Sequence, residues 1–183
     1  MDKVTIPDSE RLTYGFITEQ DTDLLFELDQ DPDVMRYING GKVTTMEDVH
    51  NIFVPRLNAY SNQEKGWGLW KVFEKDTNDF IGWVLVRPLD FFSDEPTQFD
   101  NLELGWRFKQ KTWGKGYGTE AAQAICNELA KLPDVKYLCA LAVKENAGSI
   151  NIMKKLGMRF IESAICKDPL GDLDVVHYQM ENT

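Results

Sequence analysis

The amino-acid sequence predicts a single α/β domain with one mixed, mostly antiparallel sheet and helices on its faces. Three observations lead to this prediction. Helical and extended patterns alternate along the chain instead of falling into separate blocks. Residues 102–108 alternate strictly between apolar and polar side chains, which is typical of a strand with one buried face. The length of 183 residues suits one domain, so we expect residues 1–183 to fold as one unit.

The first half of the chain predicts a strand, then helices, then a hairpin. Thr18 can cap a helix, because its hydroxyl can accept a hydrogen bond from the first turn. Three leucines follow at helical spacing, and Pro32 ends this helix. Two aromatic, β-branched stretches separated by KDTND indicate a hairpin. In order, the expected elements are a strand at 9–18, a helix after Thr18, a short helix at 34–38, a helix at 44–60, and strands at 66–75 and 79–89.

The second half predicts strands that alternate with helices. A polar, acidic loop is expected at residues 90–100, before the half-buried strand. The uninterrupted apolar run YLCALAV indicates a central strand that is covered on both faces. The expected elements, in order, are a strand at 102–108, a helix from about 118 to 131, a strand at 137–143, a short helix closed by Gly157, and a terminal hairpin that turns at residues 169–172.

Composition and charge exclude several classes of function. The net charge of −10 argues against nonspecific nucleic-acid binding, which requires a basic surface, and is compatible with a cationic partner. The chain has no run of about 18 apolar residues, so we expect no membrane partner. Cys126, Cys139 and Cys166 show no metal-ligand spacing and only two histidines accompany them. We therefore expect buried, reduced thiols, a cytoplasmic location and no metal site.

The most informative stretch is WGKGYGTEAAQAI, residues 113–125. Gly114, Gly116 and Gly118 occupy alternate positions directly before a helix-forming run. A helix N-terminus presents unpaired N–H groups and the positive end of the helix dipole. Glycines let the backbone approach an anion without intervening side chains. The stretch therefore predicts a phosphate-binding loop, and a flexible glycine turn without a ligand is the alternative.

Two common nucleotide-binding motifs do not fit this chain. The dinucleotide fingerprint G-x-G-x-x-G fails, because Thr119 stands where the third glycine is required. The sequence GGKVT, which begins at Gly40, superficially resembles a P-loop, but no helix signal follows it directly. A nucleotide-binding protein is therefore a disfavoured interpretation.

Ordered segments of the chain resemble the GNAT N-acetyltransferases. WGKGYGTEA is similar to motif A of that family, whose glycines match Gly116 and Gly118, whereas Trp113 replaces the usual Arg or Gln. LELGWRF resembles the fourth strand of the ribosomal-protein (RimJ/RimL-type) branch, and NAGSINIMKKLGM resembles its closing element. SERLTYGFITEQDTDLLFEL is similar to the usual start of that branch, so the resemblance extends over nearly the whole chain.

The resemblance implies that the fourth and fifth strands splay apart and that acetyl-CoA binds there. The pantetheine arm would pair, strand-like, with Trp106, Arg107 and Phe108, where a backbone N–H would polarise the acetyl carbonyl. Asn146 would form a hydrogen bond to the cofactor arm. The pyrophosphate would lie on the loop made by Trp113, Gly114, Lys115, Gly116, Tyr117, Gly118 and Thr119.

Two residues are candidates for proton transfer. An amine must lose a proton before it attacks, and Glu103 could accept this proton directly or through water. The alternative is a solvated strand glutamate. Ser149 is the candidate acid for the departing CoA thiolate, because Met153 stands where many members of the family have a tyrosine. Asn146 and Ser149 could equally cap the helix that they begin.

The leading functional hypothesis is an N-acetyltransferase that moves the acetyl group of acetyl-CoA to a primary amine. The resemblance implies direct attack in a ternary complex, without a metal. The acceptor would be a protein N-terminus, as in the ribosomal-protein branch, or a small amine such as an aminoglycoside or a polyamine. The alternative from another class is a non-catalytic acyl-CoA-binding module. Exposed strand edges at the terminal hairpin are compatible with a homodimer.

Overall fold

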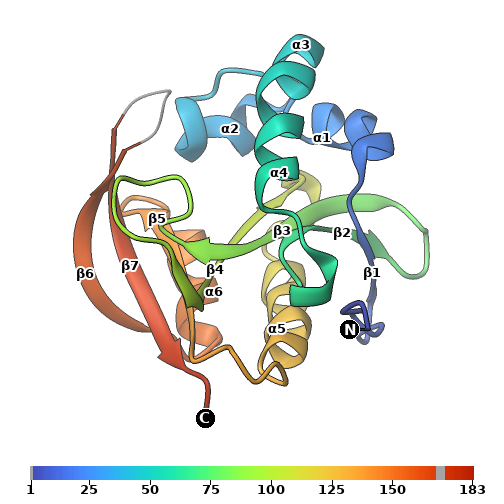
Figure 1. The fold of residues 1–183 in the computed structure, drawn as a ribbon. Coiled ribbons are helices and arrows are strands. Elements are labelled where there is room, and N and C mark those ends of the chain that lie inside the picture. Colours follow the sequence, from blue (N-terminus) through green and yellow to red (C-terminus); the bar gives the residue numbers. More distant parts are fainter. Residues whose placement is uncertain (1, 168–171) are drawn as a thin grey trace.

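Seven strands form one mixed sheet in the computed structural model, which describes residues 2–167 and 172–183 (Figure 1). The strand order is β1-β2-β3-β4-β5-β7-β6, and every neighbouring pair is antiparallel except β4 and β5. The strands are β1 (Leu12–Phe16), β2 (Gly68–Glu74), β3 (Phe80–Leu89), β4 (Gln98–Phe108), β5 (Tyr137–Val143), β6 (Arg159–Cys166) and β7 (Leu173–Glu181). The predicted fold class is confirmed.

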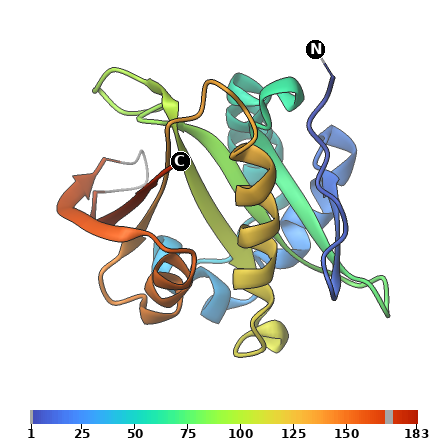
Figure 2. The same ribbon diagram turned by 90° about the horizontal axis from the view of Figure 1, so that it is seen from below.

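Helices cover both faces of this sheet. The helices between β1 and β2 lie on one face, and α5 and α6 pack side by side on the other (Figures 1 and 2). The helices are α1 (Thr22–Leu28), α2 (Pro32–Asn39), α3 (Met46–Asp48), α4 (Val54–Tyr60), α5 (Tyr117–Leu129) and α6 (Ala147–Lys155). A π-helical segment, Val49–Phe53, joins α3 to α4, so the helix predicted at 44–60 is present as one continuous stretch.

The alternation of β4 assigns its side chains to the two faces. Leu102, Leu104 and Phe108 are buried in a core cluster that includes residues of α5 and α6. Glu103 and Arg107 belong to the opposite face, where Arg107 reaches the end of α1. The predicted alternation of residues 102–108 is therefore confirmed, and it places the candidate base on the face covered by α1 to α4.

The central parallel pair of strands is only partly paired. β4 and β5 pair through Asn101–Leu104 and Tyr137–Ala140. Beyond this point β4 stays paired with β3 as far as Phe108, and β5 stays paired with β7 as far as Val143. The two strands therefore separate after Leu104, which confirms the expected splay. We call the gap between residues 105–108 and residues 141–143 the split.

Two local expectations are wrong. Residues 98–100 belong to β4 and not to the acidic loop, because the strand extends beyond a shift in register to pair Gln98 with Leu89 of β3. Cys166 is only partly buried, because it lies on β6 at the edge of the sheet. The predicted turn at residues 169–172 lies mostly outside the described residues.

Candidate active site

The three glycines of the loop serve two different purposes. Gly114 (φ 74°) and Gly116 (φ 79°) adopt left-handed backbone conformations that disfavour residues with a Cβ atom. Gly118 lies in the first turn of α5, where a Cβ atom would stand 2.8 Å from Ile152 Cδ1 of α6. The first two glycines therefore shape the loop, and the third lies where the side chain of Ile152 from α6 packs against the first turn of α5.

The loop follows β4 and folds back onto its end. Trp113 is 48% exposed and donates a hydrogen bond from Nε1 to the carbonyl oxygen of Phe108 at 2.9 Å. Gly116 is the N-cap of α5 and has no side chain to cap the first amides of this 13-residue helix. These amides and the positive end of the helix dipole are suited to an anion. The local geometry therefore fits a phosphate-binding loop.

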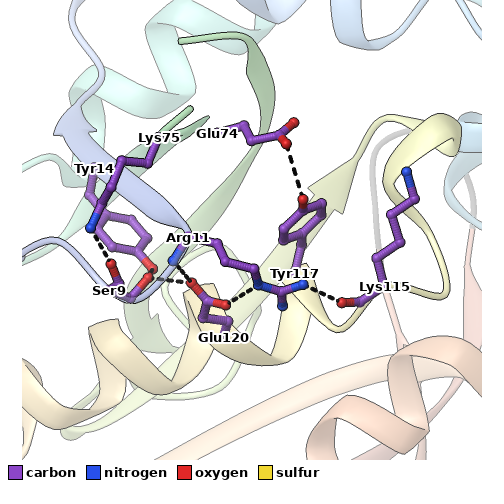
Figure 3. Close-up of polar contacts among 8 residues, drawn as sticks. All are labelled: Ser9, Arg11, Tyr14, Glu74, Lys75, Lys115, Tyr117 and Glu120. Carbon is purple, nitrogen blue, oxygen red and sulfur yellow. Dashed lines mark hydrogen bonds and ion pairs between the residues drawn. The ribbon is translucent and has the colours of Figure 1, made fainter. Parts of the chain in front are cut away.

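The segment before β1 holds the first turn of α5 (Figure 3). Glu120 accepts hydrogen bonds from Arg11 N and Nε at 2.9 and 2.7 Å, and from Ser9 Oγ at 2.6 Å. Burial alone would raise the pKa of Glu120, but these hydrogen bonds outweigh it and lower the pKa. Arg11 and Glu120 were not predicted as site residues, because two residues 109 positions apart leave no local signal of their contact in the sequence.

Glu103 lies at the base of the split and is paired with Arg87 on β3. The distance from Arg87 Nε to Glu103 Oε2 is 3.1 Å, and the two side chains are 20% and 13% exposed. Burial opposes the charge of Arg87, but attraction to Glu103 outweighs it and raises the pKa of Arg87. The ring of Tyr60, whose pKa burial raises to about 12, lies 6.0 Å from the guanidinium. A fully solvated strand glutamate, the alternative interpretation, does not fit this environment.

Arg107 uses its side chain to fasten β4 to the helical layer. Its NH1 group donates to Asp29 Oδ1 at 2.8 Å, and Thr44 Oγ1 donates to Asp29 Oδ2 at 2.9 Å. The guanidinium also lies 4.8 Å from the ring centroid of Trp83. The side chain is therefore engaged within the protein, which leaves the backbone of Arg107 for the strand-like pairing that the sequence predicts.

Asn146 and Ser149 have separate positions at the start of α6. Asn146 caps the helix, since its Oδ1 accepts a hydrogen bond from Ser149 N at 3.2 Å. Ser149 Oγ instead accepts a hydrogen bond from Trp106 Nε1 at 3.1 Å. This bond joins the diverging end of β4 to the helix that follows β5, so it crosses the split on the α6 face. Because an indole N–H can only donate, the hydroxyl proton of Ser149 remains available for donation.

The predicted site residues thus lie around one feature of the sheet. Trp106 and Ser149 meet on the α6 face of the split, Glu103 lies on the opposite face, and the glycine loop lies beyond the end of β4. Within residues 2–167 and 172–183, no group of three or more His, Cys, Asp or Glu side chains could hold a metal ion. No helix of the same described ranges has the length and apolar character to cross a membrane.

Comparison with known proteins assigns the family. The family model of the acetyltransferase (GNAT) domain matches residues 11–159, which include β4, the glycine loop and α5. This chain belongs to the GNAT acetyltransferase family. The uncharacterized N-acetyltransferase YnaD of Bacillus subtilis is 32% identical over 153 residues, which cover 82% of this chain and 81% of that protein.

Solved structures share the whole fold. A GNAT-family acetyltransferase from Bacillus anthracis superposes with a TM-score of 0.75 at 28% identity, covering 98% of this chain and 99% of that one. The aminoglycoside acetyltransferase AAC(6')-Ib in complex with coenzyme A superposes with a TM-score of 0.74 at 19% identity, covering 93% of this chain and 94% of that one. The ribosomal L7/L12 α-N-protein acetyltransferase RimL in complex with coenzyme A superposes with a TM-score of 0.70 at 15% identity, covering 96% of this chain and 97% of that one. The last two proteins share the fold but have chemically different acceptors.

Proposed function

We propose that this chain is an N-acetyltransferase that moves the acetyl group of acetyl-CoA to a primary amine in a ternary complex. The observation that carries the proposal is the split between β4 and β5, with a glycine loop beyond its end, inside a GNAT domain. Residues 105–108 and 141–143 do not pair with each other across the split. An extended pantetheine arm could use their backbone groups in the same way that a peptide adds to a sheet edge.

Acetyl-CoA would bind with its pantetheine arm beside Trp106, Arg107 and Phe108. Its pyrophosphate would lie on residues 113–119, where the amides and dipole of α5 favour an anion. Two left-handed glycines keep side chains out of this loop, and the exposed Lys115 adds a positive charge. A backbone N–H at the split would polarise the acetyl carbonyl. Asn146, whose Oδ1 caps α6, keeps its amide N–H₂ as a donor for the arm.

The transfer would need two proton movements. The amine nitrogen bonds to the carbonyl carbon, and the bond between that carbon and the CoA sulfur breaks. The attacking nitrogen loses a proton, for which Glu103 is the proposed acceptor, directly or through water. The departing thiolate gains a proton, for which Ser149 is the proposed donor. The ion pair with Arg87 holds the carboxylate of Glu103 in place at the base of the split.

The acceptor is proposed to be a cationic amine. The net charge of −10 gives a negative field that attracts cations. The proposed acceptor is a protein N-terminus, as in the RimJ/RimL-type branch that LELGWRF and NAGSINIMKKLGM resemble, or equally a small amine. The structural neighbours named above are an aminoglycoside acetyltransferase and a ribosomal-protein acetyltransferase, and a spermidine N-acetyltransferase from Vibrio cholerae shares the fold, so polyamines and aminoglycosides belong in the same test. A cytoplasmic location and a homodimer complete the proposal.

Two measurements test the proposed function. Acetyl-CoA should raise the melting temperature, because a ligand of the native state stabilises it, whereas ATP and NAD should not. Turnover of acetyl-CoA should then appear in a screen of N-terminal peptides, polyamines and aminoglycosides. Equal stabilisation by ATP would contradict the acyl-CoA site. Stabilisation by acetyl-CoA without turnover on any amine would instead support a non-catalytic acyl-CoA-binding module.

A further inference from the structure

We propose that Arg11 is a positioning residue for the pyrophosphate loop. Its guanidinium ties the glycine loop to the first turn of α5 and neutralises Glu120 beside the phosphates. The inference rests on the proposed function, since it assigns a role at the same cofactor site. Arg11 lies before β1, far in sequence from the loop that it contacts.

One side chain joins both ends of the glycine segment. Arg11 Nε donates to Glu120 Oε1 at 2.7 Å, and Arg11 NH1 donates to the carbonyl oxygen of Lys115 at 2.8 Å. The guanidinium carbon lies 4.3 Å from the ring centroid of Tyr117. Arg11 NH2 is 3.4 Å from the point at which a Cβ atom on Gly116 would stand. Arg11 therefore contacts or borders the loop at four of the six positions from 115 to 120.

The segment that carries Arg11 is itself held firmly (Figure 3). Ser9 Oγ donates to Glu120 Oε2 and lies 2.6 Å from the hydroxyl of Tyr14 on β1. Lys75 Nζ donates to the carbonyl oxygen of Ser9 at 2.7 Å. These contacts tie the residues before β1 to the sheet and to α5 together. The backbone that carries the guanidinium of Arg11 is therefore held in one position.

The aromatic ring beside the guanidinium is also fixed in place. The hydroxyl of Tyr117 donates to Glu74 Oε1 at 3.2 Å, which ties the first residue of α5 to the end of β2. Figure 3 shows Arg11 between this ring and Glu120. Arg11 thus contacts two side chains of the first turn of α5, and each of them has a second partner elsewhere in the fold.

Two physical effects make this arrangement useful for binding. A loop that contains glycines can adopt many backbone conformations when nothing holds it. Because Arg11 holds the loop before the pyrophosphate binds, less conformational entropy is lost on binding. The carboxylate of Glu120 lies in the first turn of α5, where an unpaired negative charge would repel phosphates. Arg11 offsets that charge while leaving the helix amides to the ligand.

The test compares two acetyl donors with Arg11→Met, using the best amine of the acceptor screen. S-acetyl-pantetheine carries the reacting thioester but lacks the pyrophosphate. Arg11→Met should raise the KM for acetyl-CoA and the Kd for CoA about tenfold and leave kcat near the wild-type value. Turnover of S-acetyl-pantetheine should stay unchanged, which a general loss of structure would not allow. Adding Glu120→Gln to Arg11→Met should recover part of the affinity by removing the unpaired charge.

Lys136→Met is the matched control. It also removes a cation from an ion pair, since Lys136 Nζ lies 3.0 Å from Asp100 Oδ2, but Lys136 directly precedes β5 and has no contact with the glycine loop. It should leave the KM for acetyl-CoA unchanged. Arg11→Lys keeps a positive charge near Glu120 but lacks the second donor arm that reaches the carbonyl oxygen of Lys115. It should therefore raise the KM for acetyl-CoA less than Arg11→Met does. It takes the place of Arg11→Met if that variant does not fold. Equal KM values for the Arg11 variants and the wild type, or equal losses with both donors, would overturn the inference. Failure of the wild type to bind CoA would instead overturn the proposed function.

Discussion

Arg87 and Glu103 face each other on β3 and β4, and their side chains form an ion pair of 3.1 Å. Glu103 is one position before the last residue of β4 that pairs with β5. The carboxylate therefore lies at the base of the split with a cation beside it. Removing either partner would leave the other charge largely buried and unpaired, which is costly. A test of Glu103 must therefore keep a polar group of the same shape.

Glu103→Gln meets this requirement. We expect it to lower kcat by about 100-fold or more, because a general base contributes roughly 10²–10⁴-fold to the rate. The Kd for acetyl-CoA should not change, since the residue is not proposed to hold the cofactor. Steady-state kinetics and calorimetry measure the two quantities, with the exposed Glu95→Gln as the control. Undiminished turnover from about pH 6 to about pH 9 would remove Glu103 from the role of base.

Ser149→Ala tests the proposed proton donor. We expect a fall in kcat of roughly tenfold or more, because the thiolate would leave without its proton donor. Trp106→Phe keeps the hydroxyl but removes the 3.1 Å hydrogen bond that orients it, so its effect on kcat should be smaller. If Ser149→Ala turns over at the wild-type rate, the hydroxyl has no part in proton transfer.

Asn146→Ala, which removes the cap of α6, should cost about 1 kcal/mol of the free energy of unfolding.

Gly116→Ala tests the shape of the loop. The left-handed conformation of Gly116 should make this change cost about 1–2 kcal/mol of the free energy of unfolding. Gly157→Ala is the matched control, because Gly157 has φ 93° and open space around it at the end of α6. Both variants should lose similar stability, but only Gly116→Ala should weaken CoA binding. Wild-type affinity in Gly116→Ala would contradict the phosphate-binding loop.

Stability in acid should depend on Glu120. Its hydrogen bonds to Ser9 and Arg11 lower its pKa in the folded state below the ordinary value of 4.5. The stabilisation is therefore present above about pH 4.5 and is lost as the pH falls through the lower folded-state pKa. Chemical denaturation at a series of pH values below about 4.5 measures the free energy of unfolding. This free energy should fall less with decreasing pH in Glu120→Gln than in the wild type. An identical pH dependence in the two proteins would show that folding does not lower the pKa of Glu120.

Local patterns predicted much of the fold. The apolar run YLCALAV coincides with β5, and the alternation of residues 102–108 correctly separated the two faces of β4. These signals are local, because a strand or a helix repeats its side-chain directions over a few residues. The start of β4 at Gln98 was missed, because acidic and polar residues suited a loop and only pairing with Leu89 made them a strand.

The partners of the site residues could not be predicted in this way. Glu103 was recognised as a candidate base, but its pairing with Arg87 depends on the register of two strands. The bond between Trp106 and Ser149 depends on how α6 packs over the split. Such contacts arise from tertiary packing, and no periodicity in one sequence encodes them.

The separation of β4 from β5 gives the sheet two inner edges. Backbone amides along residues 105–108 and 141–143 that point into the split have no strand opposite them, so they should exchange with deuterated solvent faster than amides in the paired part of β4. A bound pantetheine arm would act as an additional, non-peptide strand. Substrate binding would then complete the sheet as well as supply the acetyl group, and slower amide exchange at these few residues would record it.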